Sequence, residues 1–304
     1  MSSFQFAILF LLALEVSAEF NCRNERNEPV DWFAVYKMPI YQDTSANGIK
    51  DGLAFYYLDS NDPTTLRPSP NNLNSSQQPI AYTLQQLYDK NGDLSVFSVM
   101  YNDEPYEESE SAKKRKKRAT VQKGHTKGVV FSDQTSGIWL VHSVPAFPPP
   151  DHYKYPNSGT IYGQTMLCIS FDYSELAKIG TQLYYNHPDI YHSNLPTAMI
   201  ATNPDLALVI GGKYMKEINH LDCQAQYAVK DAMSIHVGLT GEFSYTKDHT
   251  KMARSSQPTK PYVCIGDINR MTSQFSRGGG TLCLLDQNLW QAFDVITTEN
   301  VCPV

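Results

Sequence analysis

The sequence predicts a layered α/β or α+β fold, and three observations lead to this prediction. Strand-like segments mix with segments of helical period, and no fixed repeat runs along the chain. Apolar residues make up 41% of the 304 residues and charged residues 18%, which is typical of a globular chain. The six cysteines include no Cys-x-x-Cys pair, so disulfide bonds are favoured over a zinc site.

The N-terminal residues 1–18 are expected to be a secretory signal peptide. Phe6 to Leu14 is an unbroken apolar run that is too short for a membrane span, and small residues follow it up to Ala18. A buried N-terminal helix is the alternative. We expect cleavage after Ala18 and a mature chain, residues 19–304, that forms one domain and has no membrane partner.

The first part of the chain is expected to form strands with one helix among them. Alternating bulky and polar residues mark the strands, and apolar residues at helical spacing mark the helix. The expected elements are a strand over 29–39, its partner over 52–59, a loop over 63–78, a helix over 82–88 and a strand over 94–101. The sequon Asn74-Ser75-Ser76 falls in this loop and is either glycosylated or unused.

A charge-dense segment, residues 102–120, interrupts this pattern. It is acidic at first and ends in the run Lys113 to Arg118, and such blocks stay solvated. The run fits the preference of secretory-pathway convertases for cleavage after Arg118. It could also be a plain basic loop, or it could guide DNA toward nearby residues by its charge.

Strands and helices alternate again after the basic segment, and apolar pattern and turn residues define them as before. The expected elements are a hairpin over 125–133 and 138–145, a strand over 164–173, a helix over 173–185, strands over 205–212, 233–239 and 263–269, and a closing helix over 289–298.

Two short segments share a His-Thr-Lys triplet, His125 to Lys127 and His249 to Lys251. In an extended strand, residues i and i+2 point to the same face, so each imidazole would project together with its ammonium. Such a pair suits a phosphodiester, because the imidazole attacks phosphorus or carries a proton while the ammonium neutralises an oxygen. Two facing pairs could divide these roles without a metal ion or cofactor. The alternative is two exposed strand edges that carry ordinary polar residues.

Several longer motifs lie between Cys22 and Cys302, namely PVDWFAVYKMP, YNDEP, GHTKGVVF, WLVHSVPAFPPP, YGQTMLCISF, DHTK, CIGDINR and RGGGTLC. In these motifs the chain resembles the deoxyribonuclease II family, the acid DNases, and the resemblance covers Cys22 to Cys302. It implies a phospholipase-D-like layered sandwich of mixed sheet and helices, built from two pseudo-symmetric halves at about 22–175 and 205–304. Each half would contribute one His-x-Lys pair to a shared site.

The resemblance also implies an activity and site residues. The family cuts DNA at acid pH without metal and leaves 3′-phosphate ends, through a covalent phosphohistidine. The catalytic positions would be His125, Lys127, His249 and Lys251, with either histidine as the nucleophile. The substrate would be DNA, mainly double-stranded, and the protein would be secreted or lysosomal; a homodimer is left open.

Further positions follow from the resemblance with alternatives beside them. Gln164 and Asn269 would hold phosphate oxygens, or would be buried amides that cap loops. His142 would be a hydrogen-bonded structural histidine or a third catalyst. The run from Arg277 to Gly280 would approach a phosphate backbone, or form a flexible turn. The family's disulfide pattern would join Cys22 to Cys168, Cys223 to Cys302 and Cys264 to Cys283.

The charge of the chain favours acid conditions for DNA binding. The 25 basic residues stand against 31 acidic ones, which gives a formal charge of −6 and repels phosphate at neutral pH. Near pH ~5 the eight histidines would mostly be protonated and some carboxylates neutralised, so the sign would invert. His152, His187, His192, His220 and His236 are interpreted as contributors to this charge only.

Two departures from the family weigh against full activity. Thr250 stands where the family usually has Ser, with Met252 where an aromatic is usual, and the chain between Cys168 and His249 is short. A two-part site tolerates little misplacement, since 1 Å can cost about 10²-fold in rate. The alternative hypothesis is therefore a secreted, non-catalytic member that binds DNA or another partner.

Overall fold

A computed structural model describes residues 20–40, 49–104, 106, 123–197, 199, 231–238, 241–269, 274 and 277–300. The predicted signal peptide, Arg118 with most of the basic segment, His220, Cys223, Cys302 and the expected strand over 205–212 lie outside these residues.

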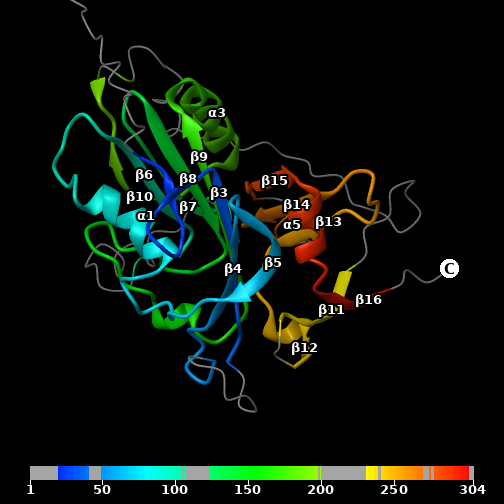
Figure 1. The fold of residues 1–304 in the computed structure, drawn as a ribbon. Helices are drawn as coiled ribbons and strands as arrows, with labels where there is room; N and C mark the ends of the chain where they lie inside the picture. The colour runs from blue at the N-terminus through cyan, green and yellow to red at the C-terminus, as the bar shows by residue number, and fades with distance from the viewer. Residues whose placement is uncertain are drawn as a thin grey trace, which may run out of the picture.

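The centre of the fold is an eight-stranded sheet in which every pairing is antiparallel (Figure 1). Its strands lie in the order β10 (Ile190–Asn194), β6 (Phe97–Asn102), β7 (Lys127–Ser132), β8 (Ser136–His142), β9 (Gln164–Asp172), β3 (Trp32–Lys37), β4 (Phe55–Asp59) and β5 (Asp62–Pro68).

Most of the strands expected from the sequence are confirmed. The β3–β4 pair, the β7–β8 hairpin, β6 and β9 form where the alternating pattern placed them. The expected loop over 63–78 is wrong in its first part, because residues 62–68 form β5. Pro63 and Pro68 concealed this strand, yet β5 is an edge strand, where proline is tolerated because one side of the backbone needs no hydrogen bond.

Both faces of the sheet are buried, and each is covered by a helix. On one face, Ile80, Leu84 and Leu87 of α1 (Pro79–Tyr88) pack with inward residues of β3, β6 and β8. On the opposite face, α3 (Leu176–Asn186) packs with β6, β7 and β8. Both helices lie where the helical pattern predicted them. Figure 1 shows α1 and α3 beside different parts of the central sheet.

The C-terminal part forms two small sheets that also pack on the central sheet (Figure 1). One has the order β12 (Phe243–Ser244), β11 (Asp231–Ile235), β16 (Ile296–Asn300), and the other the order β13 (Met252–Arg254), β14 (Tyr262–Gly266), β15 (Thr281–Leu285). Their apolar residues form one core with Ala34, Tyr36 and Leu58 of β3 and β4. Because β3 alternates in and out, its other side chains serve the α1 core.

The expected closing helix over 289–298 is wrong in its second half. Helix α5 (Gln287–Ala292) ends early, and Ile296 to Thr298 lie in β16. These β-branched side chains lose χ1 freedom in a helix and fit a strand better. The N-terminal pair β1 (Cys22–Arg23) and β2 (Pro29–Val30) forms a separate short hairpin.

Disulfides join Cys22 to Cys168 and Cys264 to Cys283. These are two of the three pairs that the family resemblance implies, and the third, Cys223 with Cys302, lies outside the described residues. The first bond ties the N-terminal hairpin to β9, and the second crosses from β14 to β15. Asn74 of the sequon is exposed in a turn. No helix among the described residues is long and apolar enough to cross a membrane.

Candidate active site

The first His-Thr-Lys triplet lies at the start of β7 and is held by backbone groups from the C-terminal part. The His125 N–H donates to the Gly278 carbonyl at 2.8 Å, and its Nδ1 contacts the Asp267 carbonyl. The Lys127 N–H donates to the Asp267 carboxylate at 3.3 Å. Since a carbonyl only accepts, Nδ1 carries the proton, and Nε2 of His125 is left for chemistry.

Asp103 joins the first triplet to a third cationic side chain. Register places Asn102 at the end of β6 opposite Lys127, so the next residue, Asp103, reaches the same spot. Its carboxylate contacts Lys127 Nζ, lies 3.5 Å from His125 Nε2 and accepts from Arg277 at 3.3 Å. The side chains of Asp103 and Lys127 are only 9% and 3% exposed, so this cluster is strongly coupled electrostatically.

The second triplet lies between the short 3-10 helix η4 (Tyr245–Lys247) and β13, and it docks onto the central sheet. Gly163 forms a parallel bridge with Asp248 and accepts from the His249 N–H at 2.9 Å. A Cβ at Gly163 would lie 2.4 Å from an Asp248 oxygen, so only glycine permits this approach. The Tyr36 hydroxyl of β3 donates to Asp248 at 2.8 Å.

The structure brings the two triplets into one electrostatic neighbourhood. The Gly266 N–H donates to the Lys251 carbonyl at 2.7 Å, and the next residue, Asp267, contacts His125 and Lys127. Burial, and after it the positive charge of Lys127, lowers the pKa of Lys251 to about 8. Asp103 and Asp267, which hold the first triplet, oppose this shift. Lys127 and Lys251 therefore add positive charge to one region of the structure, which favours the binding of an anion.

The strand-like setting expected for both triplets is wrong. His125 and Thr126 precede β7, and residues 249–251 precede β13, so only Lys127 belongs to a strand. The side chains of His125 and Lys127 still reach the same carboxylate, Asp103. In the second triplet, Lys251 Nζ instead donates to the carbonyl of His249.

The two histidines differ in the groups around their rings. Burial lowers the pKa of His125 most and Lys127 lowers it further, whereas Asp103 and the Asp267 carbonyl raise it. Partial burial, Lys251 and Lys37 all lower the pKa of His249. Asp103, 3.5 Å from His125 Nε2, therefore favours a proton on this ring, whereas Lys251 and Lys37 disfavour one on His249.

The other amide and histidine candidates occupy different environments. Gln164 is buried at the start of β9, where its side-chain oxygen accepts from the Ser143 hydroxyl. Asn269 is half-buried, and its N–H donates to Gln274 at 2.7 Å. His142 is fully buried, its Nδ1 accepts from the Val144 N–H, and its Nε2 has no hydrogen-bond partner among the described residues.

Burial also corrects the expected charge inversion. Desolvation lowers the pKa of His142 to about 3, so this residue stays neutral at pH ~5. The pKa values of His187 and His192 are lowered by the same cause. The histidines therefore supply less positive charge in acid than their count suggests.

The glycine run after Arg277 is neither an open phosphate cradle nor a loose turn. A Cβ at Gly278 would lie 2.2 Å from the Asn186 carbonyl, and the Arg277 guanidinium donates to the carbonyls of Lys123 and Gly124. The run packs between the end of α3 and the His125 segment. Its glycines allow this close backbone contact.

Several of these groups were missed by sequence reasoning. They are Lys37, Asp103, Asp248, Asp267 and Tyr162, whose ring stacks on that of His249. Each lies inside a stretch that carries the family resemblance, but a lone carboxylate or aromatic residue gives no signal of a site by itself. Only the sheet register and the docking of the C-terminal segments place them around the two histidines.

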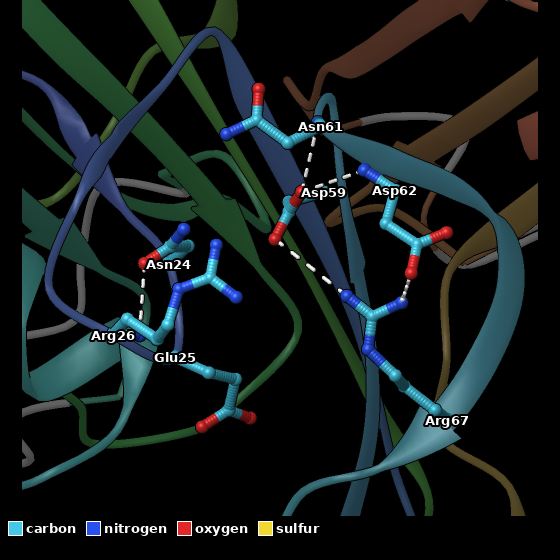
Figure 2. A pocket seen from close by; sticks show the side chains of 7 residues that line it. All are labelled: Asn24, Glu25, Arg26, Asp59, Asn61, Asp62 and Arg67. Atoms are coloured by element: carbon cyan, nitrogen blue, oxygen red, sulfur yellow. Dashed lines mark hydrogen bonds and ion pairs between the residues drawn. The ribbon is translucent and has the colours of Figure 1, made fainter.

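A separate polar pocket lies at the N-terminal hairpin and the β4–β5 turn. Figure 2 shows its side chains, with Arg67 paired to Asp62 and near Asp59. Its lining residues are Asn24, Glu25, Arg26, Asp59, Asn61, Asp62 and Arg67, and none of them belongs to the His-Thr-Lys triplets. Among the described residues, no group of three or more His, Cys, Asp or Glu side chains could hold a metal ion.

Comparison with known proteins places this chain in a family. The family model described as Deoxyribonuclease II matches residues 21–221 and 216–301. The chain is 46% identical to Deoxyribonuclease-2 of Caenorhabditis elegans, over 97% of this chain and 98% of the relative. It is 32% identical to Plancitoxin-1 of Acanthaster planci (94% and 93%) and 30% identical to Deoxyribonuclease-2-alpha of Mus musculus (96% and 96%).

The same comparisons locate a difference in length. The alignment with the Caenorhabditis relative runs over 368 positions, more than the 304 residues of this chain, so the relative contains residues that this chain lacks. The two segments that match the family model meet at residues 216–221, inside the stretch between Cys168 and His249. Apart from this difference in length, the chain matches the family along nearly its whole length. It belongs to the deoxyribonuclease II family and is a deoxyribonuclease II-like hydrolase.

Proposed function

We propose that the protein is an acid endonuclease that hydrolyses phosphodiester bonds of DNA, mainly double-stranded, without a metal ion. The observation that carries this proposal is the meeting of the two His-Thr-Lys triplets at one cluster. The Asp267 carbonyl contacts His125 Nδ1 and its carboxylate accepts from the Lys127 N–H, while the preceding residue, Gly266, donates its N–H to the Lys251 carbonyl at 2.7 Å. Family membership supplies DNA as the substrate class.

The proposed reaction has two steps with opposite proton movements. His249 attacks phosphorus, the bond from phosphorus to O5′ breaks, and His125 gives its proton to O5′. Water, deprotonated by His125, then cleaves the phosphohistidine and leaves a 3′-phosphate. Asp103 beside His125, and the Lys251 ammonium beside His249, support this division of roles.

In the proposed reaction, the ammonium groups of Lys127 and Lys251 stabilise negative charge on the phosphate. A phosphorane-like transition state carries negative charge on its nonbridging oxygens, and Lys127 and Lys251 would face these oxygens. The pKa of Lys251 is lowered to about 8, so this side chain is protonated in acid and loses its proton in mild base. The loss of this charge is one reason to expect falling activity above neutral pH.

Single substitutions test the division of roles. His125→Ala and His249→Ala should each lower the rate on plasmid DNA by about 10³-fold or more, because the two act as a unit. With His125→Ala, 32P-labelled DNA should leave label on the protein that is stable in base and labile in acid. Label on His249→Ala instead would reverse the assignment.

The two-half, phospholipase-D-like arrangement is part of the proposal. It is supported by the contribution of His125 and Lys127 from the central sheet, and of His249 and Lys251 from the segment before β13. We also propose a secreted or lysosomal location, since the predicted signal peptide and the two disulfides fit an oxidising or exported setting. Sedimentation of the purified chain would test the open question of a homodimer.

A second candidate function is DNA binding without cleavage, and the shorter Cys168–His249 stretch favours it. In that case the wild-type chain would bind labelled duplex DNA at pH 5 and leave it intact. Binding together with nicking by wild type, and binding alone by His249→Ala, would support the nuclease instead.

A further inference from the structure

Lys37 is a buried charge at the end of β3, and it is not used in the proposed reaction. Its side chain is fully enclosed, and burial lowers the pKa of Lys37 to about 7. Among the residues that the structure describes, no carboxylate lies within ion-pair distance of its ammonium. Burying an ammonium without a paired carboxylate costs free energy unless hydrogen bonds stabilise it. The hydrogen-bond partners of Lys37 therefore indicate what this residue does.

The partners of Lys37 are backbone carbonyls of the segment just before β9. Its Nζ donates to the carbonyl of Thr160 and, at 2.7 Å, to that of Tyr162. The carbonyl between them, of Ile161, accepts from the Ile40 N–H at 3.0 Å. Three consecutive carbonyls are therefore tied to the end of β3, and the segment has little freedom to move.

The fixed segment carries the ring that contacts the second catalytic candidate. Tyr162 stacks on His249 with ring centroids 3.8 Å apart and an angle of 7° between the planes. The next residue, Gly163, receives the His249 N–H. Both the ring and the backbone of His249 thus rest on the segment that Lys37 holds.

We propose that Lys37 and Tyr162 are positioning residues that fix the imidazole plane of His249 for attack on the phosphodiester. This inference rests on the proposed function, because it gives His249 a reacting role. His249 is exposed and lies in the segment that precedes β13, so few neighbours restrict its side chain. Without the stacked ring of Tyr162, the imidazole would sample several rotamers. A misplacement of about 1 Å can lower a rate on the order of 10²-fold.

The test compares substitutions at the two positions in the full chain. Tyr162→Leu removes the ring, and Lys37→Met removes the ammonium but keeps an unbranched stem. Each should lower kcat by about 10- to 100-fold while KM changes little, because the loss is one of orientation and not of binding. Tyr162→Phe keeps the ring face and should restore most of kcat.

Tyr153→Leu is the matched control. Tyr153 is also half-buried, packs its ring on Phe147 at 6.0 Å and donates to the Leu73 carbonyl, with no contact to either triplet. The Tyr153→Leu variant should lose folding stability as Tyr162→Leu does, but it should keep the kcat of wild type. Equal losses of kcat in both variants would overturn the proposal.

Proton NMR of the imidazole gives a readout that does not depend on catalysis. A stacked tyrosine shifts the His249 ring protons upfield, and His249→Ala identifies their signals. Tyr162→Leu and Lys37→Met should both move these signals downfield, whereas Tyr162→Phe and Tyr153→Leu should not. An unchanged His249 signal in Lys37→Met would overturn the proposal even if DNA cleavage fell, since Lys37 would then act elsewhere. If the wild-type chain cut no DNA but the signals moved as expected, the proposed function would fail and the positioning would stand.

Discussion

The side chains of His125, Lys127 and Arg277 all contact the carboxylate of Asp103. A substitution of Asp103 therefore tests how this carboxylate affects the protonation of His125. Burial and Lys127 lower the pKa of His125, and Asp103 opposes this shift. In its proposed role as the general acid, His125 works only while protonated, so we expect Asp103 to extend the activity toward higher pH. The same carboxylate contacts Lys127 and Arg277 and holds them in place.

Asp103→Asn should therefore move the high-pH limb of kcat to lower pH. The neutral amide no longer favours the imidazolium, and the pKa of His125 falls. A pH–rate profile on plasmid DNA measures this shift. Asp151→Asn is the control, because Asp151 pairs with His152 at 2.7 Å in an exposed position; it should leave the profile unchanged. A shift to higher pH in Asp103→Asn would contradict the role of His125 as the acid.

His142 gives a prediction about stability. Its pKa is about 3 in the folded chain against an ordinary value of 6.5, so the unfolded chain takes up a proton that the folded chain refuses. The stability from neutral His142 is complete above pH 6.5 and is lost as the pH falls toward 3. Between pH 8 and pH 5 the loss is about 2 kcal/mol.

His142→Gln should remove this loss. Its free energy of unfolding by urea should fall by ~2 kcal/mol less than that of wild type between pH 8 and pH 5. The comparison uses the change with pH, so a uniform destabilisation of the variant does not affect it. His152→Gln, at an exposed position, should follow wild type. Parallel pH curves for wild type and His142→Gln would show that His142 is protonated in the folded chain.

The segment that carries His249 depends on the contact of Asp248 with the central sheet. Burial raises the pKa of Asp248, and the Tyr36 and Thr250 hydroxyls each donate to it at 2.8 Å. A buried carboxylate that loses such a donor is left partly unsatisfied, which costs roughly 1–3 kcal/mol. We therefore expect the anchoring of Asp248 to affect catalysis through the neighbouring His249.

Tyr36→Phe should lower both stability and kcat. We expect a loss of ~1–3 kcal/mol in unfolding free energy and a lower kcat, because the His249 segment loses a tether. Tyr57→Phe is a matched control, since the Tyr57 hydroxyl donates to buried Asp59 at 2.7 Å away from the triplets. It should lose similar stability and keep kcat. A normal kcat in Tyr36→Phe would show that the hydrogen bond from Tyr36 to Asp248 is not needed for catalysis.

The elements show what the sequence alone could predict. Strong alternation located β3, β6 and β9, and helical period located α1 and α3, because local pattern decides these elements. The sequence could not predict β5, whose prolines are tolerated only at an edge. It also could not predict the early end of α5, where pairing with β11 decides in favour of β16.

The candidate site was predictable only in part. The paired triplets gave His125, Lys127, His249 and Lys251, since identical residue types at identical spacing form a visible pattern. Asp103 and Tyr162 reach these side chains through sheet register and docking, over separations of 24 and 87 residues in sequence. Contacts of that range depend on the tertiary fold and leave no local trace.

At the scale of the whole molecule, a disulfide bond determines whether the two fragments of the predicted cut after Arg118 would stay joined. The disulfide between Cys22 and Cys168 spans this position, so a cut chain would stay together. Secreted material should run as one band without reductant and as two bands with it, the smaller one spanning residues 19–118. A single full-length band under reduction, from cells with active convertases, would leave the basic run to act by charge alone.

The central claim is that two histidines and two lysines from separate parts of the fold cut DNA in acid without a metal. Plasmid nicking by the purified chain at pH 5 in EDTA tests it most directly, with His125→Ala and His249→Ala beside wild type. We predict nicking by wild type with a bell-shaped dependence around pH ~5, and almost none by either variant. Nicking that appears only after Mg²⁺ or Zn²⁺ is added, or that persists in either variant, would contradict it.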